Sequence, residues 1–196
     1  MIKKMIICTF LPVFTFLQAF AQSFVNPDTV CAGSNVYYKI QNPTANSTFT
    51  WGIYKGEGSI TSGAGTDSIR IAWNNTAGID SIWVVETNQA NCTGDTARLK
   101  VVRTAAPNAS FDNAAICYGE TLNVNFTGYP PWQFEYTLNG NTLTLSNIVQ
   151  NPYPLSDAGT YVLVQISDKY CNNSSPSGQL NAIIAAPLQE LQIYHE

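Results

Sequence analysis

Few residues of this sequence could support catalysis. Its one histidine, His195, stands directly before the last residue. Nucleophilic catalysis needs a base that is held in place, whereas the ends of a chain fray. The 13 acidic residues could supply the carboxylate pair of a glycoside hydrolase, but they stand mostly at turns and strand ends, where Asp caps and turns the chain. We therefore expect no catalytic residues and predict that the protein is not an enzyme.

Motifs for cofactors are equally weak. The glycine-rich segment 56–65 lacks the Lys-Ser/Thr ending and the following helix of a phosphate-binding loop. Calcium binds clustered oxygen ligands, whereas Asp67, Asp80, Asp95 and Asp157 stand singly. We predict no cofactor and no metal site.

The cysteines indicate disulfide chemistry. Cys8 lies in an N-terminal apolar run, which leaves Cys31, Cys92, Cys117 and Cys171. An even number of cysteines in an exported chain favours a disulfide framework. Zinc is the alternative, but it prefers close pairs such as C-x-x-C, whereas these four are separated by 61, 25 and 54 positions.

The first 21 residues have the pattern of a cleaved export signal. Lys3 and Lys4 precede an apolar run, and Ala19-Phe20-Ala21 provides a small-x-small cleavage site before Gln22. Pro12 interrupts the apolar run, which is shorter than the roughly 20 residues that a spanning helix needs. We predict an exported protein, located outside the cell, on its surface or in the periplasm, with no integral membrane segment after cleavage.

Composition excludes one class of partner. Without the signal, seven basic and 13 acidic residues remain, a net charge near −6 that repels phosphate backbones. The 45% hydrophobic and 11% charged content suits a packed β-protein. We therefore expect no nucleic-acid partner, and instead a protein or glycan at the cell surface or in the envelope.

Strand patterns occur in two similar halves. Val30-Cys31-Ala32-Gly33-Ser34 is echoed by Ile116-Cys117-Tyr118-Gly119-Glu120. In each half the same parts follow in the same order: an alternating strand (36–40 or 122–126), a tryptophan (Trp51 or Trp132), a long apolar strand (81–86 or 159–166) and the second cysteine. Period-2 alternation predicts further strands at Ile69, Ile71 and Trp73 and at Phe134, Tyr136 and Leu138. We predict two tandem immunoglobulin-like β-sandwich domains, with one disulfide inside each, Cys31–Cys92 and Cys117–Cys171.

Specific motifs carry a resemblance to known domains. In the first half they are Cys31-Ala32-Gly33-Ser34, Phe49-Thr50-Trp51, Gly63-Ala64-Gly65-Thr66-Asp67-Ser68-Ile69 leading to Trp73, and Val85-Glu86-Thr87-Asn88 before Cys92-Thr93-Gly94. These resemble the PKD-like domain of secreted and surface proteins from bacteria that use type IX secretion. In the second half they are Ile116-Cys117-Tyr118-Gly119-Glu120, Gly128-Tyr129-Pro130-Pro131-Trp132, and Gly159-Thr160-Tyr161 running to Asp168 and Cys171. That half resembles a companion immunoglobulin-like repeat, and Asp157 to Tyr161 resembles a tyrosine corner.

The resemblance implies a domain layout. We predict a signal peptide at 1–21, a PKD-like sandwich at 22–104, an immunoglobulin-like sandwich at 105–186 and a C-terminal tail at 187–196. Larger members of the group often carry a C-terminal sorting domain, which we do not find in this sequence. The sequence is therefore consistent with periplasmic retention, another exit route or an N-terminal fragment of a larger secreted protein.

Aromatic residues are the candidate ligand contacts. Tyr129 and Trp132 belong to a stiff, proline-rich segment, and Trp83 lies on a strand opposite Ile82. Exposed rings would stack on sugars, whereas tryptophans of sandwiches usually fill the core, the expected place for Trp51 and Trp132.

Four hydroxyl residues follow Asp and precede an apolar residue, a pattern that resembles the O-glycosylation site of exported proteins in the same bacteria. They are Thr29, Ser68, Ser81 and Thr96. Asp followed by Ser or Thr is also how a turn leads into a strand, so this structural reading stands beside the modification.

We thus predict a non-catalytic exported interaction module that acts in surface adhesion, in spacing, or in binding protein or carbohydrate. The alternative is a structural component of the envelope, the secretion machinery or the gliding apparatus, whose free sheet edge or C-terminal strand 190–194 pairs with a partner.

Overall fold

The structure is a computed structural model that describes residues 27–192. All regular elements of this range are β-strands, which confirms the predicted all-β class. No helix in the described range is long and apolar enough to span a membrane. The predicted signal peptide and His195 lie outside the described residues.

The alternating apolar residues form strands as predicted. Ile69, Ile71 and Trp73 are all buried on β5 (Ser68–Trp73). Trp132, Phe134 and Tyr136 are buried on β11 (Trp132–Leu138), while the residues between them are exposed (Gln133) or half-buried (Glu135). Period-2 alternation places one face of each strand in a core and leaves the other toward solvent.

Strands β1 to β7 form what we call the N-terminal strand group. One sheet has the order β1-β7-β6-β3 and the other the order β2-β5-β4. The bounds are β1 (Asp28–Cys31), β2 (Asn35–Lys39), β3 (Thr48–Ile53), β4 (Gly58–Ser62), β5, β6 (Gly78–Thr87) and β7 (Ala97–Thr104). β1 runs parallel to β7, and the other pairs are antiparallel.

Strands β8 to β16 form the C-terminal strand group. One sheet has the order β13-β10-β8 and the other the order β12-β11-β14-β16-β9, with β15 also paired to β14. The bounds are β8 (Ala109–Phe111), β9 (Ala115–Ile116), β10 (Leu122–Phe126), β11, β12 (Asn141–Ile148), β13 (Tyr153–Leu155), β14 (Gly159–Ser167), β15 (Asn172–Asn173) and β16 (Asn181–Ile184). β9 runs parallel to the last strand, β16, just as β1 does to β7.

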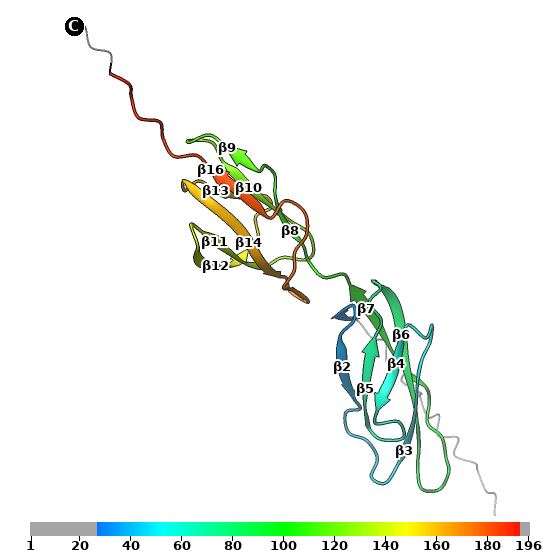
Figure 1. The fold of residues 1–196 in the computed structure, drawn as a ribbon. Helices are drawn as coiled ribbons and strands as arrows, with labels where there is room; N and C mark the ends of the chain where they lie inside the picture. Colours follow the sequence, from blue (N-terminus) through cyan, green and yellow to red (C-terminus); the bar gives the residue numbers. More distant parts are fainter. Residues whose placement is uncertain (1–26, 193–196) are drawn as a thin grey trace, which may run out of the picture.

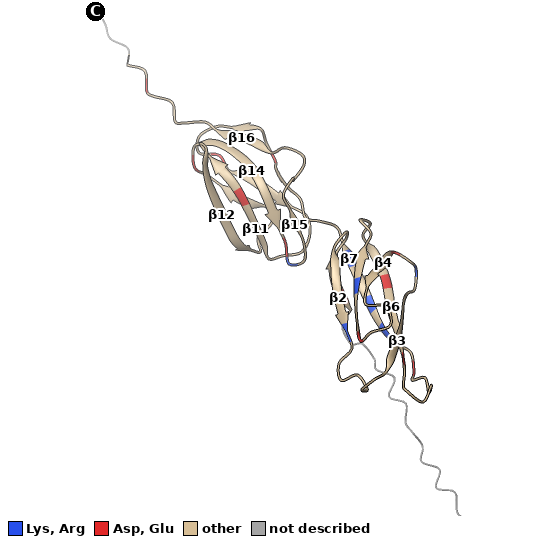
Figure 2. Cartoon of the chain, turned by 60° about the horizontal axis from the view of Figure 1, so that its bottom comes forward, with Lys and Arg blue, Asp and Glu red and all other residues tan. Residues whose placement is uncertain are grey.

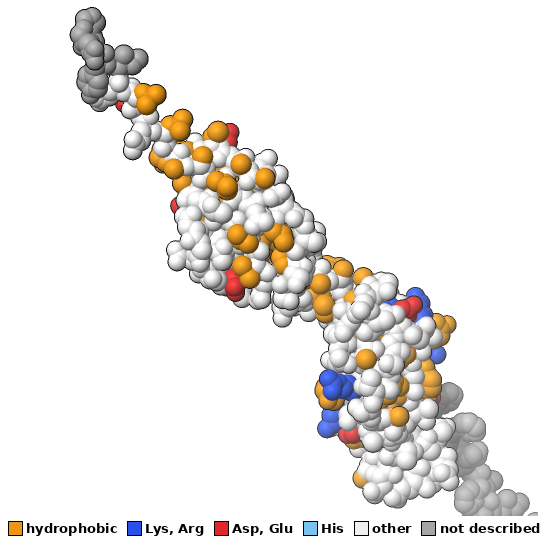
Figure 3. Space-filling model, viewed as in Figure 1, with side chains coloured by type: hydrophobic (Ala, Val, Ile, Leu, Met, Phe, Trp, Pro, Cys, Tyr) orange, Lys and Arg blue, Asp and Glu red, His pale blue; other side chains and the backbone are white. Residues whose placement is uncertain are grey.

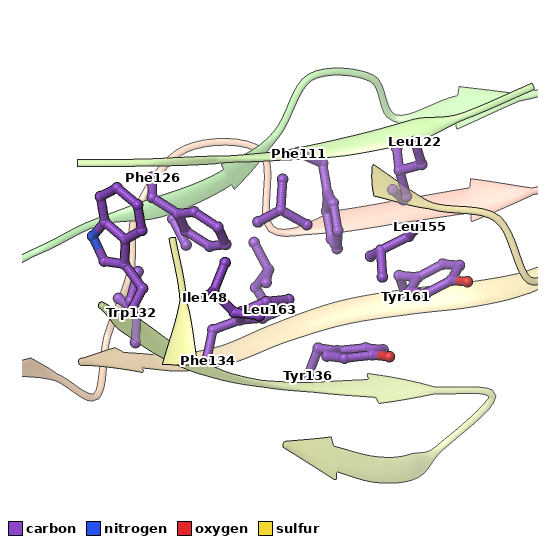
Figure 4. Close-up of a cluster of buried hydrophobic side chains, with 14 of the residues drawn as sticks. Phe111, Leu122, Phe126, Trp132, Phe134, Tyr136, Ile148, Leu155, Tyr161 and Leu163 are labelled. Atoms are coloured by element: carbon purple, nitrogen blue, oxygen red, sulfur yellow. The ribbon is translucent and has the colours of Figure 1, made fainter. Parts of the chain in front are cut away.

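Each strand group has its own hydrophobic core. The C-terminal core is aromatic, with the ring of Phe134 in contact with those of Phe126 and Tyr136 (Figure 4). Phe134 also meets the ring of Tyr153 edge-on. Tyr161 is buried beside it and donates its hydroxyl hydrogen to the carbonyl of Asp157 at 2.6 Å, the hydrogen bond of a tyrosine corner. The N-terminal core centres on Ile69, Ile71 and Val101.

Two buried polar residues, Asp80 and Arg103, make separate contacts at one end of the N-terminal strand group. Asp80 accepts hydrogen bonds from the backbone N–H groups of Lys55 and Glu57, at 2.9 and 3.1 Å. Arg103 donates to the carbonyl of Thr76 at 2.8 Å and lies over the Trp73 ring. These contacts brace the end of β7 that leads into the second group.

The two strand groups lie end to end (Figure 1). Every strand pair in the described range is formed within one group, so the short segment 105–108 connects two separately hydrogen-bonded bodies. The junction between them brings together residues far apart in the sequence and is the candidate functional site.

Candidate functional site at the junction of the strand groups

A disulfide bond crosses the junction. It joins Cys31, the last residue of β1, to Cys171 in the turn between β14 and β15. The two Cα atoms lie 5.2 Å apart although 140 positions separate them. The bond therefore ties the end of the first strand group to a hairpin of the second.

The predicted disulfides, one inside each domain, are wrong in this structure. Cys31 pairs in register with Thr104 at the end of β7, whereas Cys92 precedes the start of that strand. The eight extended residues of β7 span about 23 Å between its start, near Cys92, and its end, beside Cys31. A disulfide needs Cα atoms within about 7 Å. The two cysteines lie at opposite ends of their group and cannot meet.

The same geometry excludes the second predicted pair. Cys117 directly follows β9, whose Ile116 pairs with Ile184, and Ile184 pairs with Gly159 at the start of β14. Cys171 follows the other end of β14, about 26 Å away along nine extended residues. Cys92 and Cys117 are free and exposed.

Thr104 covers the bonded sulfur of Cys171. Its hydroxyl oxygen lies 3.4 Å from the Sγ atom of Cys171 and 3.3 Å from the carbonyl oxygen of Val30. Both Thr104 and Cys171 are buried. The disulfide is thus enclosed by the end of β7 and shielded from solvent on the side of Cys171.

Asp168 organises the C-terminal side of the junction. Its Oδ1 atom accepts hydrogen bonds from the backbone N–H groups of Tyr170 and Cys171, at 2.8 and 2.7 Å. Its Oδ2 atom accepts another from the N–H of Tyr129 at 2.9 Å. Gly128 has φ +96°, and a Cβ atom there would clash with Oδ2 of Asp168. One carboxylate therefore holds two loops together, and glycine is required beside it.

The connecting segment is anchored to the C-terminal strand group. The carbonyl of Pro107 accepts a hydrogen bond from the side chain of Asn173 at 2.9 Å. Asn108 donates through its side chain to the carbonyl of Ser177 and accepts from the Ser177 N–H, at 2.8 and 2.7 Å. Residues 107 and 108 thus belong structurally to the second body, and little slack chain remains at the junction.

The three aromatic residues predicted as candidate ligand contacts lie in different environments. Tyr129 is 51% exposed at the junction and meets Tyr170 edge-to-face at 5.6 Å. Trp132 is 6% exposed in the core, where it stacks on Phe126 and donates its ring N–H to the carbonyl of Thr127. Trp83 is half-buried on β6 against Gly52, while Ile82 is buried on the opposite face. They do not form one surface.

The four candidate O-glycosylation residues are also dispersed. Thr96 is exposed before β7, whereas Thr29, Ser68 and Ser81 are half-buried on β1, β5 and β6. Asp80, beside Ser81, is buried and bonds backbone N–H groups. Within residues 27–192 no three metal-ligating side chains cluster.

Sequence reasoning missed Thr104 and Asp168 as junction residues. A signal for Asp168 was present: an Asp three residues before a cysteine in a hairpin can accept the N–H groups that follow it. Thr104 had no such signal, because its role depends on the approach of a cysteine 67 positions away.

One family model matches part of the sequence. Residues 18–101 match the family described as PKD-like domain. No protein with a curated description matches the sequence. PKD-like and immunoglobulin-like domains are commonly non-catalytic modules for interaction or spacing.

Several solved structures match this chain at low sequence identity. The I-band fragment I67–I69 of titin is 15% identical, with a TM-score of 0.46 over 81% of this chain and 62% of that one. The D00–D0 domain of intimin is 7% identical, with a TM-score of 0.40 over 84% and 98%. The fibronectin(III)-like modules of Clostridium thermocellum CbhA are 15% identical, with a TM-score of 0.35 over 89% and 98%. This chain spans less than two thirds of the length of the titin fragment.

Proposed function

We propose that the protein is a non-catalytic exported spacer and interaction module, built of two tandem domains held rigidly end to end. The disulfide Cys31–Cys171 is the observation that carries this proposal. A covalent bond across a junction removes bending that a short linker alone would allow. An element that only joined two independent binding domains would need no such bond.

The surroundings of the disulfide support a rigid role. The segment 105–108 is fixed at Pro107 and Asn108, and Thr104 is buried against Cys171. Hydrogen bonds at both sides of the bond oppose rotation about it.

The domains we propose are 22–104, PKD-like, and 105–186, immunoglobulin-like, preceded by a signal peptide at 1–21 and followed by a tail at 187–196.

The proposed location is the cell surface, the exterior or the periplasm of a bacterium with type IX secretion. A disulfide in the described chain suits an oxidising compartment, because cytosolic thiols are kept reduced. The proposed partner is a protein or glycan of the surface or envelope. Tyr129, exposed beside the rigid junction, is the best placed of the three candidate contact residues.

The test of rigidity uses the two free thiols as labelling sites. Cys92 and Cys117 are exposed in different strand groups, so donor and acceptor dyes attached to them report the distance across the junction. We expect a narrow single-molecule transfer distribution for the native protein. The variant Cys31→Ser with Cys171→Ser should keep both domains folded and give a broader distribution. Equal widths for the two proteins would reject the spacer role.

Partner binding requires a separate test. A glycan array and capture of outer-membrane proteins, probed with native protein and with Tyr129→Ala, measure whether the exposed ring contributes. Tyr54→Ala, at another exposed tyrosine, is the matched control. We expect loss of binding in Tyr129→Ala only, and equal binding by all three proteins would exclude Tyr129 from the contact.

The exposed tail favours a second candidate function in envelope assembly. Leu188 and Leu191 are 97% and 93% exposed beyond β16. Apolar side chains on an extended segment can add as a strand to the sheet edge of a partner. Deletion of residues 187–196 should then abolish partner capture while the circular dichroism spectrum stays unchanged; unchanged capture would argue against assembly through the tail.

A further inference from the structure

We propose that Cys117 of one copy of this chain forms a disulfide with Cys92 of a second copy, so that copies join head to tail. The proposal deepens the spacer role by naming a partner. It rests on the disulfide Cys31–Cys171 and on the equivalence of each free cysteine to one of the two bonded residues. The test counts linked copies, whereas the test of the spacer role measures a distance within one copy, so either can fail alone.

Cys117 occupies the place in the second strand group that Cys31 occupies in the first. Cys31 ends β1 and Cys117 directly follows β9, and each of these short strands runs parallel to the last strand of its group. The carbonyl of each accepts the N–H of the residue three positions on, at 3.1 Å from Ser34 and 3.2 Å from Glu120. A glycine with positive φ, Gly33 or Gly119, lies two positions after each cysteine. We call these two residues the turn cysteines.

Cys92 is likewise the counterpart of Cys171. The side chain of Asn88 accepts the N–H of Cys92 at 3.0 Å, as the side chain of Asp168 accepts the N–H of Cys171 at 2.7 Å. The backbone N–H of Asn88 also donates to the Cys92 carbonyl at 3.0 Å, and that of Asp168 to the Cys171 carbonyl at 2.8 Å. We call Cys92 and Cys171 the hairpin cysteines.

The bond within the chain is thus a turn cysteine of one group joined to a hairpin cysteine of the next. One cysteine of each kind remains, and both are exposed. Within its group each lies at the end away from the junction, because the register places turn and hairpin cysteines at opposite ends of a group. The end-to-end arrangement therefore leaves Cys92 and Cys117 at opposite ends of the molecule, where they cannot bond to each other (Figure 1).

Charge favours the head-to-tail order over a bond between two C-terminal strand groups. Residues 105–186 contain five acidic residues and one basic residue, Lys169, whereas residues 22–104 contain six of each. Basic side chains are accordingly concentrated on the N-terminal strand group (Figures 2 and 3). A Cys117–Cys117 bond would bring two negatively charged groups together, while a Cys117–Cys92 bond places a negative group beside a neutral one.

The bond forms by thiol–disulfide exchange with a small disulfide such as oxidised glutathione. The thiolate of Cys117 attacks one sulfur of the small disulfide, releases one small thiol and forms a mixed disulfide. The thiolate of Cys92 from the second copy attacks the Cys117 sulfur and releases the second small thiol. Two protein thiols are oxidised, one small disulfide is reduced to two thiols, and the two thiol protons end on the released molecules.

The experiment is oxidation of the purified protein in a glutathione redox buffer, followed by non-reducing electrophoresis and peptide mapping. We expect a ladder of linked copies whose new cross-linked peptide joins Cys117 to Cys92. Cys92→Ser with Cys117→Ser is the control that stays monomeric with Cys31–Cys171 intact. A native protein that stays monomeric under these conditions would overturn the proposal.

Mixing the two single variants tests the direction of the bond. Cys92→Ser retains Cys117, and Cys117→Ser retains Cys92, so a mixture can form only dimers. We expect roughly tenfold more mixed dimer than either homodimer if matched ends guide the reaction. A ratio of mixed dimer to either homodimer of about two, the value for random pairing of two exposed thiols, would overturn the proposed direction of the bond. Near-ultraviolet circular dichroism verifies that every variant is folded.

Discussion

Asp168 is only partly buried, yet its side chain connects two loops at the junction. Its two carboxylate oxygens accept three backbone N–H groups from two loops at the junction. Hydrogen bonds to a charged acceptor are stronger than neutral ones, and donors left unpaired keep their desolvation cost. The side chain therefore determines the position of the Cys171 hairpin relative to Tyr129.

Replacing this carboxylate should weaken the C-terminal strand group. We expect Asp168→Ala to lower the free energy of unfolding by about 1 to 3 kcal/mol, because three donors lose their acceptor. Urea unfolding measures the loss, and amide exchange at Tyr129 and Cys171 should become faster. Asp95→Ala, at an exposed loop, should change stability by no more than about 0.5 kcal/mol. Equal effects of both substitutions would contradict the role of Asp168.

Tyr161 makes the free energy of unfolding depend on pH in the alkaline range. Burial raises the pKa of Tyr161 to about 12, and the nearby Asp157 carboxylate adds to the increase. Below pH 10 the phenol is protonated in both the folded and the unfolded chain. Between about pH 10 and pH 12 the unfolded chain loses the proton first, so the free energy of unfolding falls as pH rises.

The variant Tyr161→Phe tests this dependence. It should be less stable than the native protein at pH 8, since it loses the hydrogen bond to the Asp157 carbonyl, and should lose less additional stability between pH 10 and 12. Burial also raises the pKa of Tyr136, so part of the alkaline decline should remain. Denaturant titrations at several pH values measure both effects. Tyr118→Phe, at an exposed position, should follow the native curve.

Among the elements, β11 contributes most to the C-terminal core. Phe134 is fully buried and its ring contacts three other aromatic rings. We expect Phe134→Ala to cost about 3 to 5 kcal/mol, because it leaves a cavity that a sandwich core closes only in part. Leu143→Ala on the exposed face of β12 should cost much less.

Hydrogen exchange resolves which strand group responds. Amides of β10, β11 and β14 should exchange faster in Phe134→Ala, while those of β5 keep their native protection, because the two groups have separate cores. Loss of protection on β5 as well would show that the two bodies unfold as one unit.

Strand positions could be predicted from sequence because one alternating pattern determines both face and burial. Leu122 to Phe126 and Gly159 to Ile166 were identified from their alternating or apolar residues and correspond to β10 and β14. The sequence also indicated two repeats with the same order of parts. It could not indicate at which end of a group each cysteine would lie, because that depends on strand register. The disulfide pairing was therefore wrong.

For the whole molecule, the junction disulfide restricts the unfolded chain. In the chain-entropy account a closed loop of this length is worth about 5 kcal/mol. We expect the variant Cys31→Ser with Cys171→Ser to be less stable in urea by up to that amount. Full native stability in the variant would mean that the bond acts on orientation alone.

The disulfide also decides how the protein would respond to tension between its termini. Force enters near Asp28 and leaves after Ile184, and the covalent path from Cys31 to Cys171 bypasses every residue between them. That bypassed segment could not lengthen even if it unfolded, which withholds roughly 480 Å of extension at about 3.5 Å per residue. A pulling experiment should show only short extensions until a reductant is added, so the module would behave as a tether of nearly fixed length.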